Sequence, residues 1–406
     1  MITKLRAFIR RFGSAVLSSR AWLTVEIKFF VRSIQRTRQL MPGGAETTTD
    51  ILICTNGGGN LGDQAMFEAF LSNTSGTVVA VMRKETDFFV PPAHTKRVEI
   101  LAVGHLLTGR PSISGRAERT LLAKVGRAAT LTVVGADILD GAYNPREALV
   151  RTQLMRAAAL NGIPAHALGF SWSPSAHPAV IKSLLAGGPA LTLRSRDPLS
   201  LKRLHQCGIA WAELVTDTVF SLPLSVDVTE PVSPYIVLNV SGLIHSRANL
   251  SKDYLRVVRF AWQQGLRVVV LPHVRRHGDD DLGAAEEVFG GLEDGRVVIA
   301  RDVDSVAAVV ELARGARWVL TGRMHLAILA MSAGTPAMVL STQGKVEGLL
   351  ALFDLEELAL EPRSGFADRV ESLVSSRGSA EWRRKIENNL PRARALSRKN
   401  FQPYTH

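Results

Sequence analysis

Apolar residues follow a repeating pattern along most of the chain. From Asp50 onward, apolar runs of four to six residues alternate with stretches of helical periodicity, which indicates a parallel sheet covered by helices. The runs expected to be strands form a first series at 51–55, 78–82, 131–134, 165–168 and 190–193, and a second at 235–240, 267–271, 297–300, 318–321 and 337–340. The pattern predicts an α/β protein with two Rossmann-like domains facing across a cleft, where the loops at the carboxyl ends of the strands would hold a ligand.

The expected domain boundary is a proline-containing stretch that interrupts this rhythm. Pro223, Pro231 and Pro234 fall between the two series of strands, as is typical of a connection between domains. We therefore expect an N-terminal domain at 50–225 and a C-terminal domain at 235–375. A basic amphipathic segment at 1–49 precedes them, and a basic helical tail at 376–406 follows.

The N-terminal segment has helical periodicity. Two sets of apolar residues each fall on one helical face, with basic residues opposite the first set: Leu5, Phe8, Ile9, Phe12 and Val16, then Ile27, Phe30, Val31 and Ile34. Two interpretations are open from the sequence. Either these faces pack on the protein's own body, or they lie on an anionic membrane surface.

The positive net charge is concentrated at the two ends of the chain, and this distribution excludes some classes of function. The formal net charge is +12; residues 1–38 hold nine Lys or Arg against Glu26 alone, and residues 381–406 hold seven against two acids. The remaining chain is therefore nearly neutral. A neutral body with basic ends argues against a nucleic-acid groove and favours tails that contact an anionic partner.

Cysteine content and the N-terminal sequence indicate the compartment. Cys54 and Cys207 are the only cysteines, too few for a disulfide framework or a cysteine zinc site, which fits a reducing compartment. Basic residues from Lys4 to Arg38 interrupt the apolar runs, so neither a signal peptide nor a spanning segment is expected. We expect a cytoplasmic protein, held peripherally at the inner face of the plasma membrane if the N-terminal segment contacts lipid.

A glycine-rich turn after the first strand is the first candidate binding site. In the run Asn56–Asp63, glycines at 57, 59 and 62 satisfy the dinucleotide fingerprint, which brings backbone N–H groups and a helix N-terminus close to a phosphate. A nicotinamide cofactor is not expected, because Asp63 puts a carboxylate where its pyrophosphate would lie. The simpler alternative is a glycine turn in which Asp63 only caps the helix.

A second candidate site lies at the end of the fourth strand of the second series. The run Trp318–His325 reads as a strand, a turn and the start of a helix, so Arg323 and His325 would lie beside unpaired backbone N–H groups. An anion bound there would contact a guanidinium and an imidazole. Lys345 follows the next strand, and adjacent parallel strands would bring it to the same edge of the sheet.

Together these motifs resemble those of the polysaccharide pyruvyl transferase family. The resemblance covers roughly residues 50–360 and rests on Gly-Asn-Leu-Gly-Asp at 59–63, Leu193–Asp197 with Ser200 and Leu204, Val215–Asp217, and Thr321–His325 with Gly334–Pro336 and Lys345. It implies a fold similar to two-domain glycosyltransferases of the B type. It also implies phosphoenolpyruvate as the donor, a pyruvyl ketal on a sugar as the product, and no cofactor or metal.

The resemblance further implies roles for individual residues. His325 matches the family's acid, and Arg323, Lys345 and Arg196 match its contacts to phosphate and carboxylate. The glycine-rich turn is expected to help bind the donor through Gly59, Asn60 and Gly62. The residues expected to bind the acceptor or support the site are Asp63, Asp137, Asp140, His273 and Asp217.

Two acidic segments stand apart from the family's pattern. Members often have three glycines after the fourth strand, where this chain has Asp137 and Asp140 within the run 135–141. These acids either hydrogen-bond sugar hydroxyls or cap a helix. In the second domain the triplet Asp279–Asp281 looks like a magnesium site, and its alternative role is an N-terminal cap.

Phosphoenolpyruvate chemistry suits these residue types. The donor's phosphate and carboxylate need cations and N–H groups, and the difficult step is protonation of its C3 methylene, for which His325 is the candidate acid. Protonation of the leaving phosphate is the alternative role of His325. Two rival functions remain: a nucleotide-sugar glycosyltransferase of the same fold, and a non-catalytic glycan- or lipid-binding protein. The expected partners are phosphoenolpyruvate, a surface polysaccharide or lipid-linked glycan precursor, and an anionic membrane, without nucleic acid.

Overall fold

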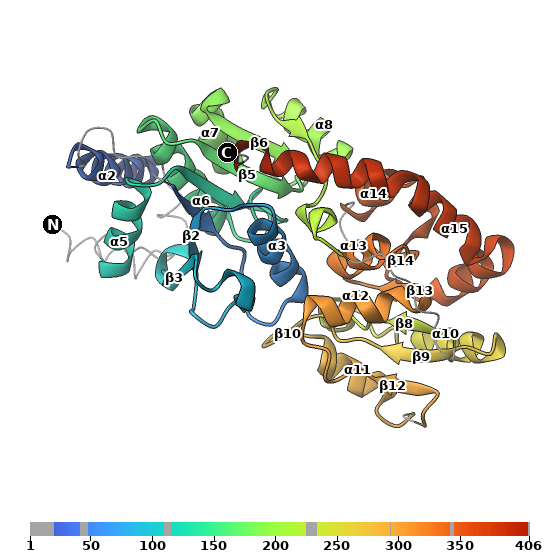
Figure 1. Ribbon diagram of the computed structural model, residues 1–406. Coiled ribbons are helices and arrows are strands. Elements are labelled where there is room, and N and C mark those ends of the chain that lie inside the picture. The colour runs from blue at the N-terminus through green and yellow to red at the C-terminus, as the bar shows by residue number, and fades with distance from the viewer. Residues whose placement is uncertain are drawn as a thin grey trace. The chain divides into compact units, whose positions relative to one another are not determined.

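The computed structural model describes residues 20–40, 48–108, 115–224, 234–292, 294–341 and 345–404 (Figure 1). They form two units, each built on its own parallel sheet. The first unit contains the described residues up to Asn56, the segment Thr74–Asp217, and the chain from Pro403 on. The second unit contains Gly57–Asn73 and Thr218–Gln402. The first apolar set of the N-terminal segment, Leu5 to Val16, lies outside the described residues.

The first unit has a parallel sheet in the order β3-β2-β1-β4-β5-β6-β7. The strands are β1 (Thr49–Ile53), β2 (Thr77–Met82), β3 (Val98–Ala102), β4 (Thr130–Val134), β5 (Ala165–Phe170), β6 (Leu191–Ser195) and β7 (Glu213–Leu214). The helices are α2 (Arg20–Gln39), α4 (Gly104–Leu107), α5 (Arg116–Val125), α6 (Pro145–Leu160), α7 (Pro178–Gly187) and α8 (Pro198–Gln206), with short 3₁₀ turns η1 (Pro92–His94) and η2 (Gly188–Ala190). Asn144 and Asp197 cap α6 and α8, each followed by a proline whose fixed φ suits a first helical position.

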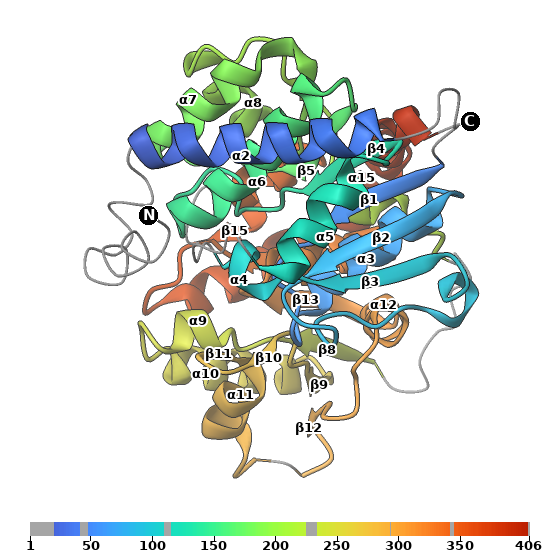
Figure 2. The same cartoon turned by 90° about the vertical axis from the view of Figure 1, so that its left-hand side faces the viewer.

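Helix α2 is part of the first unit's core. Phe30 and Ile34 join the core cluster of this unit, and Trp22 is buried as well. Figure 2 shows α2 running beside α6, where Glu26 and Arg146 form a buried, bidentate ion pair. For residues 20–39 the apolar face therefore packs on the protein's own body, one of the two interpretations left open by the sequence. Basic residues occupy the outer face.

We expect Glu26→Gln to lower the free energy of unfolding by about 2 kcal/mol, because the buried Arg146 would lose its charged partner and hydrogen bonds to charged groups contribute about that much. Chemical denaturation followed by circular dichroism measures this. Glu85→Gln is the matched control, since Glu85 is exposed and its substitution should stay within about 0.5 kcal/mol of the native protein. Equal stabilities for the two variants would show that the pair does not hold α2 in place.

The second unit has a parallel sheet in the order β12-β9-β8-β13-β14-β15. Its strands are β8 (Tyr235–Leu238), β9 (Arg267–Val270), β12 (Val297–Ile299), β13 (Ala316–Thr321), β14 (Ala337–Leu340) and β15 (Ala359–Leu360), with an antiparallel hairpin of β10 (Arg275–Arg276) and β11 (Asp279–Asp280). Its helices are α3 (Leu61–Ser72), α9 (Gly242–His245), α10 (Ser251–Gln263), α11 (Asp281–Phe289), α12 (Val306–Arg314), α13 (Met324–Ser332), α14 (Lys345–Ala351) and α15 (Phe366–Arg398). The 3₁₀ turns are η3 (Thr218–Ser221), η4 (Glu356–Leu358) and η5 (Lys399–Tyr404).

The structure confirms the two Rossmann-like units, and every expected strand overlaps an observed one. The strands that the pattern did not indicate lie at sheet edges or in the hairpin: β3, β7, β10, β11 and β15. Edge strands expose part of both faces and so lack a continuous apolar run; β3, for example, reads Val-Glu-Ile-Leu-Ala and is only partly buried.

The unit boundaries differ from the expected ones in three respects. The division falls at Asp217 and Thr218, and the glycine-rich turn with α3 belongs to the second unit, where α3 packs against η3, α12 and α13. The basic C-terminal segment is not a separate tail. It continues α15, which bends at Gly378 (φ 68°), and it buries Trp382, Ile386 and Phe401 in the second unit.

Hydropathy gives one further result for the described residues. None of their helices is both long enough and apolar enough to cross a membrane.

Candidate functional site

The glycine-rich turn folds against the loop that follows β9. Gly59 adopts a φ of +85°, in the left-handed region that favours glycine, and a side chain there would collide with the carbonyl oxygen of Arg275. Arg275 N–H donates to the carbonyl of Gly59 at 2.9 Å, and Asn60 forms an antiparallel bridge with Val274. The glycine at 59 thus allows two backbone segments of the second unit to meet.

The amino end of α3 is occupied by the protein's own acceptors. Asn60 is the N-cap, and its Oδ1 accepts from Gly62 N at 2.9 Å and Asp63 N at 3.4 Å. Leu61 N donates to the carbonyl of His273 at 3.2 Å. The phosphate cradle expected here is therefore filled by internal hydrogen bonds. Asp63 is not the cap; its Oδ2 accepts from Gly57 N at 3.0 Å and closes the glycine turn.

The two sequence motifs meet at Gly62 and His325. A Cβ added to Gly62 would lie 2.5 Å from Cβ and 2.6 Å from Nδ1 of His325, so the imidazole packs directly on the first turn of α3. His325 itself lies in the first turn of α13, and no side chain among the described residues caps that helix. An uncapped helix start has N–H groups directed outward. His325 is thus partly exposed beside a potential anion site and is held on one side by glycine.

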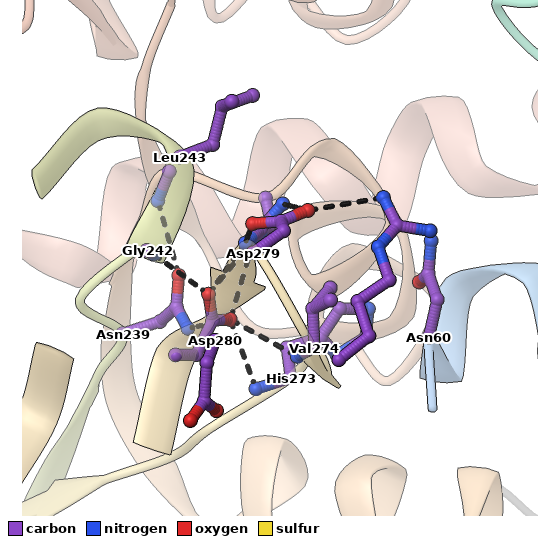
Figure 3. A network of polar contacts seen from close by, with 12 residues as sticks. Asn60, Asn239, Gly242, Leu243, His273, Val274, Asp279 and Asp280 are labelled. Carbon is purple, nitrogen blue, oxygen red and sulfur yellow. Dashed lines mark hydrogen bonds and ion pairs between the residues drawn. The ribbon is translucent and has the colours of Figure 1, made fainter. Parts of the chain in front are cut away.

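Asp281 is the centre of a buried hydrogen-bond network at the carboxyl ends of β8, β9 and β13. Its carboxylate accepts from Asn239 Nδ2 at 2.8 Å and from the backbone N–H groups of Gly242, His273 and Val274 at 2.9, 3.1 and 3.0 Å. Figure 3 shows Asn239, Gly242, His273 and Val274 close together in this network. Asn239 Oδ1 in turn accepts from Thr321 Oγ1 at 3.1 Å. The network joins the loops that carry the candidate site.

Arg323 is the charged partner of this network. Its Nε donates to Asp281 Oδ1 at 3.1 Å, its Nη1 donates to Asp279 Oδ2 at 3.1 Å, and its Nη2 contacts both carboxylates. Burial alone would lower the pKa of Arg323, but the charges and hydrogen bonds of Asp281 and Asp279 outweigh it and raise that pKa. The resemblance implied a contact to the donor's anions. In the structure the guanidinium is instead engaged by two carboxylates, which neutralise its charge.

The acidic triplet has two roles. Asp279 and Asp281 bind Arg323, whereas Asp280 is the N-cap of α11 and accepts from Leu282 N at 3.1 Å. Arg276 also donates to Asp279, at 3.0 Å. Within the ranges that the structure describes, no three His, Cys, Asp or Glu residues are grouped as a metal site would require.

His273 lies behind this network. Its ring is 1 % exposed, and neither nitrogen has a hydrogen-bond partner among the described residues. Burial, followed by the charges of His325 and Arg323, lowers its pKa well below the usual range, so the imidazole is neutral. His273 was expected to bind the acceptor or support the site. Its burial fits support, and its backbone contributes directly through the bonds to Leu61 and Asp281.

Lys345 is the first residue of α14, which follows β14; its side chain lies outside the described part. Strands β13 and β14 are adjacent and parallel, with Val319 paired to Ala337. Their carboxyl ends, which lead to His325 and Lys345, therefore lie at the same edge of one sheet.

The remaining predicted site residues belong to the first unit. Arg196 is buried, and its guanidinium donates to Asp217 Oδ2 at 2.8 Å and to Ser171 Oγ at 2.8 Å. Asp140 is buried and accepts from Ala142 N and Ser173 N, both at 2.9 Å, so it joins the loop after β4 to the loop after β5. Asp137 lies partly buried in the turn after β4. Arg196 and Asp217 thus form an internal ion pair of the first unit.

The sequence analysis did not identify Asn239, and it assigned Asp281 to metal binding or capping. Asn239 comes directly after the apolar strand β8, and a polar residue that ends a buried strand was the available signal. The partners of Asn239 lie 32 to 83 positions away along the chain, and those of Asp281 lie 7 to 42 positions away. No local pattern indicates such contacts.

Solved structures similar to this chain share its fold. MnaA of S. aureus, solved with UDP, has a TM-score of 0.59 at 10% identity, covering 87% of this chain and 94% of that one. The putative UDP-N-acetylglucosamine 2-epimerase of Listeria monocytogenes has a TM-score of 0.55 at 13% identity, with 87% and 94% covered. A glycosyltransferase of Rickettsia africae has a TM-score of 0.53 at 10% identity, with 89% and 98% covered. These likenesses establish a fold of the B-type glycosyltransferase kind.

Sequence comparison identifies the family. No curated protein sequence is significantly similar to this chain. The sequence model of the polysaccharide pyruvyl transferase family, however, matches residues 88–344, which is well over half of the chain and includes His325, Arg323 and the network around Asp281. The chain belongs to the polysaccharide pyruvyl transferase family.

Proposed function

We propose that this protein transfers a pyruvyl group from phosphoenolpyruvate to two hydroxyls of a sugar and releases phosphate. The acceptor in this proposal is a surface polysaccharide or its lipid-linked precursor. The observation that carries the proposal is the placement of His325: its imidazole packs on Gly62 at the uncapped start of α13, and the neighbouring Arg323 is held by two carboxylates. Such an acid beside outward N–H groups suits an anionic donor that must be protonated.

The proposed reaction has two stages. His325 donates a proton to C3 of phosphoenolpyruvate, the methylene becomes a methyl group, and C2 becomes electrophilic. A sugar hydroxyl adds to C2 and loses its proton to the imidazole of His325, giving a tetrahedral carbon that carries methyl, carboxylate, phosphate and one sugar oxygen. A second hydroxyl then attacks C2 while the bond from C2 to the phosphate oxygen breaks. The phosphate leaves with the electrons of that bond and takes up the proton of the second hydroxyl, and the ketal ring closes.

Donor binding is assigned to the backbone and to cations other than Arg323. Because Asp279 and Asp281 neutralise Arg323, we propose that it positions the turn before His325 and does not contact the donor directly. The N–H groups at the start of α13 and Lys345 at the same sheet edge would take the phosphate and carboxylate. Arg196 would contribute only if its pair with Asp217 opened. Asp137 remains a candidate for the acceptor's hydroxyls.

The choice of donor has a direct test. Phosphoenolpyruvate should raise the melting temperature of the protein, whereas UDP should not, since a ligand that binds only the folded state stabilises it. Phosphate release with a pool of glycan acceptors should continue unchanged after chelation of divalent metals. UDP stabilisation without a phosphoenolpyruvate effect would instead favour a nucleotide-sugar transferase, because one similar structure was solved with UDP. Loss of turnover on chelation, restored by magnesium, would overturn the metal-independent mechanism.

A location at the inner face of the plasma membrane completes the proposal. A lipid-linked acceptor is confined to the membrane, so an enzyme that modifies it gains from a membrane contact. Helix α2 supports this part, because its apolar face is used by the first unit while Lys28, Arg32 and Arg36 on its outer side are exposed.

A further inference from the structure

A groove lies between α2 and α5 in the first unit. It encloses a cavity of about 720 Å³, and the described residues that line it all come from these two helices. Figure 2 shows both helices on one side of this unit. Cationic and apolar side chains line the groove together with the hydroxyl groups of Ser33 and Thr37, and none of the described lining residues is acidic.

The cations of the groove form a row. Lys28, Arg32 and Arg36 follow one another at four-residue spacing, so they lie on one face of α2 over about 12 Å. Arg119 faces them from α5. All four are exposed, and within the described part of the chain none forms an ion pair or a side-chain hydrogen bond. Like charges at this spacing destabilise a helix, so the row favours binding of anions.

The groove also has apolar lining residues, which lie one to four positions along each helix from its cations. Val25 and Phe29 on α2 line it together with Leu122 and Ala123 on α5. Val25 is 52 % exposed, which leaves apolar surface open to solvent beside the charged row. A free phosphate ion would leave this apolar strip in water, whereas an amphiphile would cover it.

We propose that this groove binds anionic phospholipid of a membrane leaflet, with headgroup phosphates against Lys28, Arg32, Arg36 and Arg119 and acyl carbons on Val25 and Phe29. The row of cations is long enough to meet more than one headgroup, which fits a leaflet. The inference rests on the membrane contact in the proposed function and adds its place and its ligand. It is independent of the donor and of the chemistry at His325.

The full-length protein and its variants are tested by co-sedimentation with phosphatidylcholine vesicles, with and without phosphatidylglycerol. The triple variant Lys28→Gln, Arg32→Gln, Arg36→Gln should bind the anionic vesicles about 100-fold more weakly, because each basic residue near such a surface contributes several-fold. Arg119→Gln, on the other wall, should weaken binding about fivefold. The matched control is Arg127→Gln, Lys182→Gln, Lys202→Gln, which removes the same charge from exposed positions of the same unit outside the groove.

Three outcomes would overturn the proposal. One is equal binding by the groove variant and the charge-matched control. Another is no preference of the native protein for anionic vesicles. The third is displacement from vesicles by inorganic phosphate well beyond that by chloride at equal ionic strength, which would indicate a free-phosphate site. Phosphoenolpyruvate-dependent phosphate release with a soluble acceptor is measured in the same preparations. Absence of the proposed reaction is therefore distinguished from absence of lipid binding by the groove.

Discussion

Replacing His325 with glutamine should lower kcat by about 100-fold or more while changing the affinity for phosphoenolpyruvate only modestly. A general acid contributes about 10²- to 10⁴-fold, and glutamine keeps the size and polarity of the side chain without an acidic proton. The loss should be confined to catalysis, because His325 is partly exposed at the start of α13 and its substitution opens no core cavity. Phosphate release under saturating donor measures kcat, and the melting-temperature shift measures binding.

The control for this substitution is His277→Gln. His277 is exposed in the turn between β10 and β11 of the same unit, so its replacement should leave kcat unchanged. Phosphate release by both variants and by the native protein is measured under the same conditions. A near-normal kcat of His325→Gln would remove His325 from the mechanism.

Replacing Arg323 with alanine should destabilise the second unit by about 3–5 kcal/mol even without ligand. The substitution would leave the carboxylates of Asp279 and Asp281, whose side chains are 11 % and 0 % exposed, without their charged partner. Arg323→Lys should recover only part of the loss, because a single ammonium cannot bridge two carboxylates as the planar guanidinium does. Thermal and chemical denaturation of the ligand-free protein measure both variants.

An exposed ion pair supplies the comparison for Arg323. Arg363 pairs with Glu361 at 2.9 Å with both side chains more than 70 % exposed, so Arg363→Ala should cost at most about 1 kcal/mol. If Arg323 served the donor alone, Arg323→Ala would raise KM for phosphoenolpyruvate and leave the ligand-free stability at the level of this control. That result would reinstate Arg323 as a direct anion contact.

The same cluster predicts a contribution to stability in acid. Burial would raise the pKa of Asp279, but the hydrogen bonds and charges of Arg323 and Arg276 outweigh it and lower that pKa below its usual 3.8. A carboxyl whose pKa is lowered by folding stabilises the protein above the usual value, and this stabilisation is lost as the pH falls through the lowered value. Asp279→Asn should therefore flatten the decline in stability below about pH 4.

Local sequence patterns were sufficient to predict the helices and strands that carry the candidate site. The apolar runs located the strands β8, β9, β13 and β14, because a strand buried on both faces must be apolar throughout. The change from strand to helical periodicity placed His325 at the start of α13 and Lys345 after the adjacent strand. The edge strands β3, β7 and β15 were missed, whereas the edge strand β12 was found because it is a run of three apolar residues.

The same local signals do not indicate contacts with partners far along the chain. Gly59, Gly62 and Asp63 match a phosphate-binding fingerprint by spacing, yet the N–H groups of that helix start are taken by Asn60 and by the carbonyl of His273. Arg323 was expected to contact anions, and its anions are Asp279 and Asp281 of the protein itself.

The sequence by itself determined the α/β class, the two Rossmann-like halves, the family, and the position of His325 at a strand end, because each follows from patterns within about 20 residues or from motifs matched in order. Only the tertiary structure decided that α3 belongs with the second unit, that Gly62 receives the imidazole of His325, and that Asp281 joins Asn239 to Arg323. The physical reason is the range of the interactions. Periodicity records which side of an element is buried, whereas hydrogen bonds and ion pairs between residues far apart in sequence depend on how the elements pack, and no single segment contains that information.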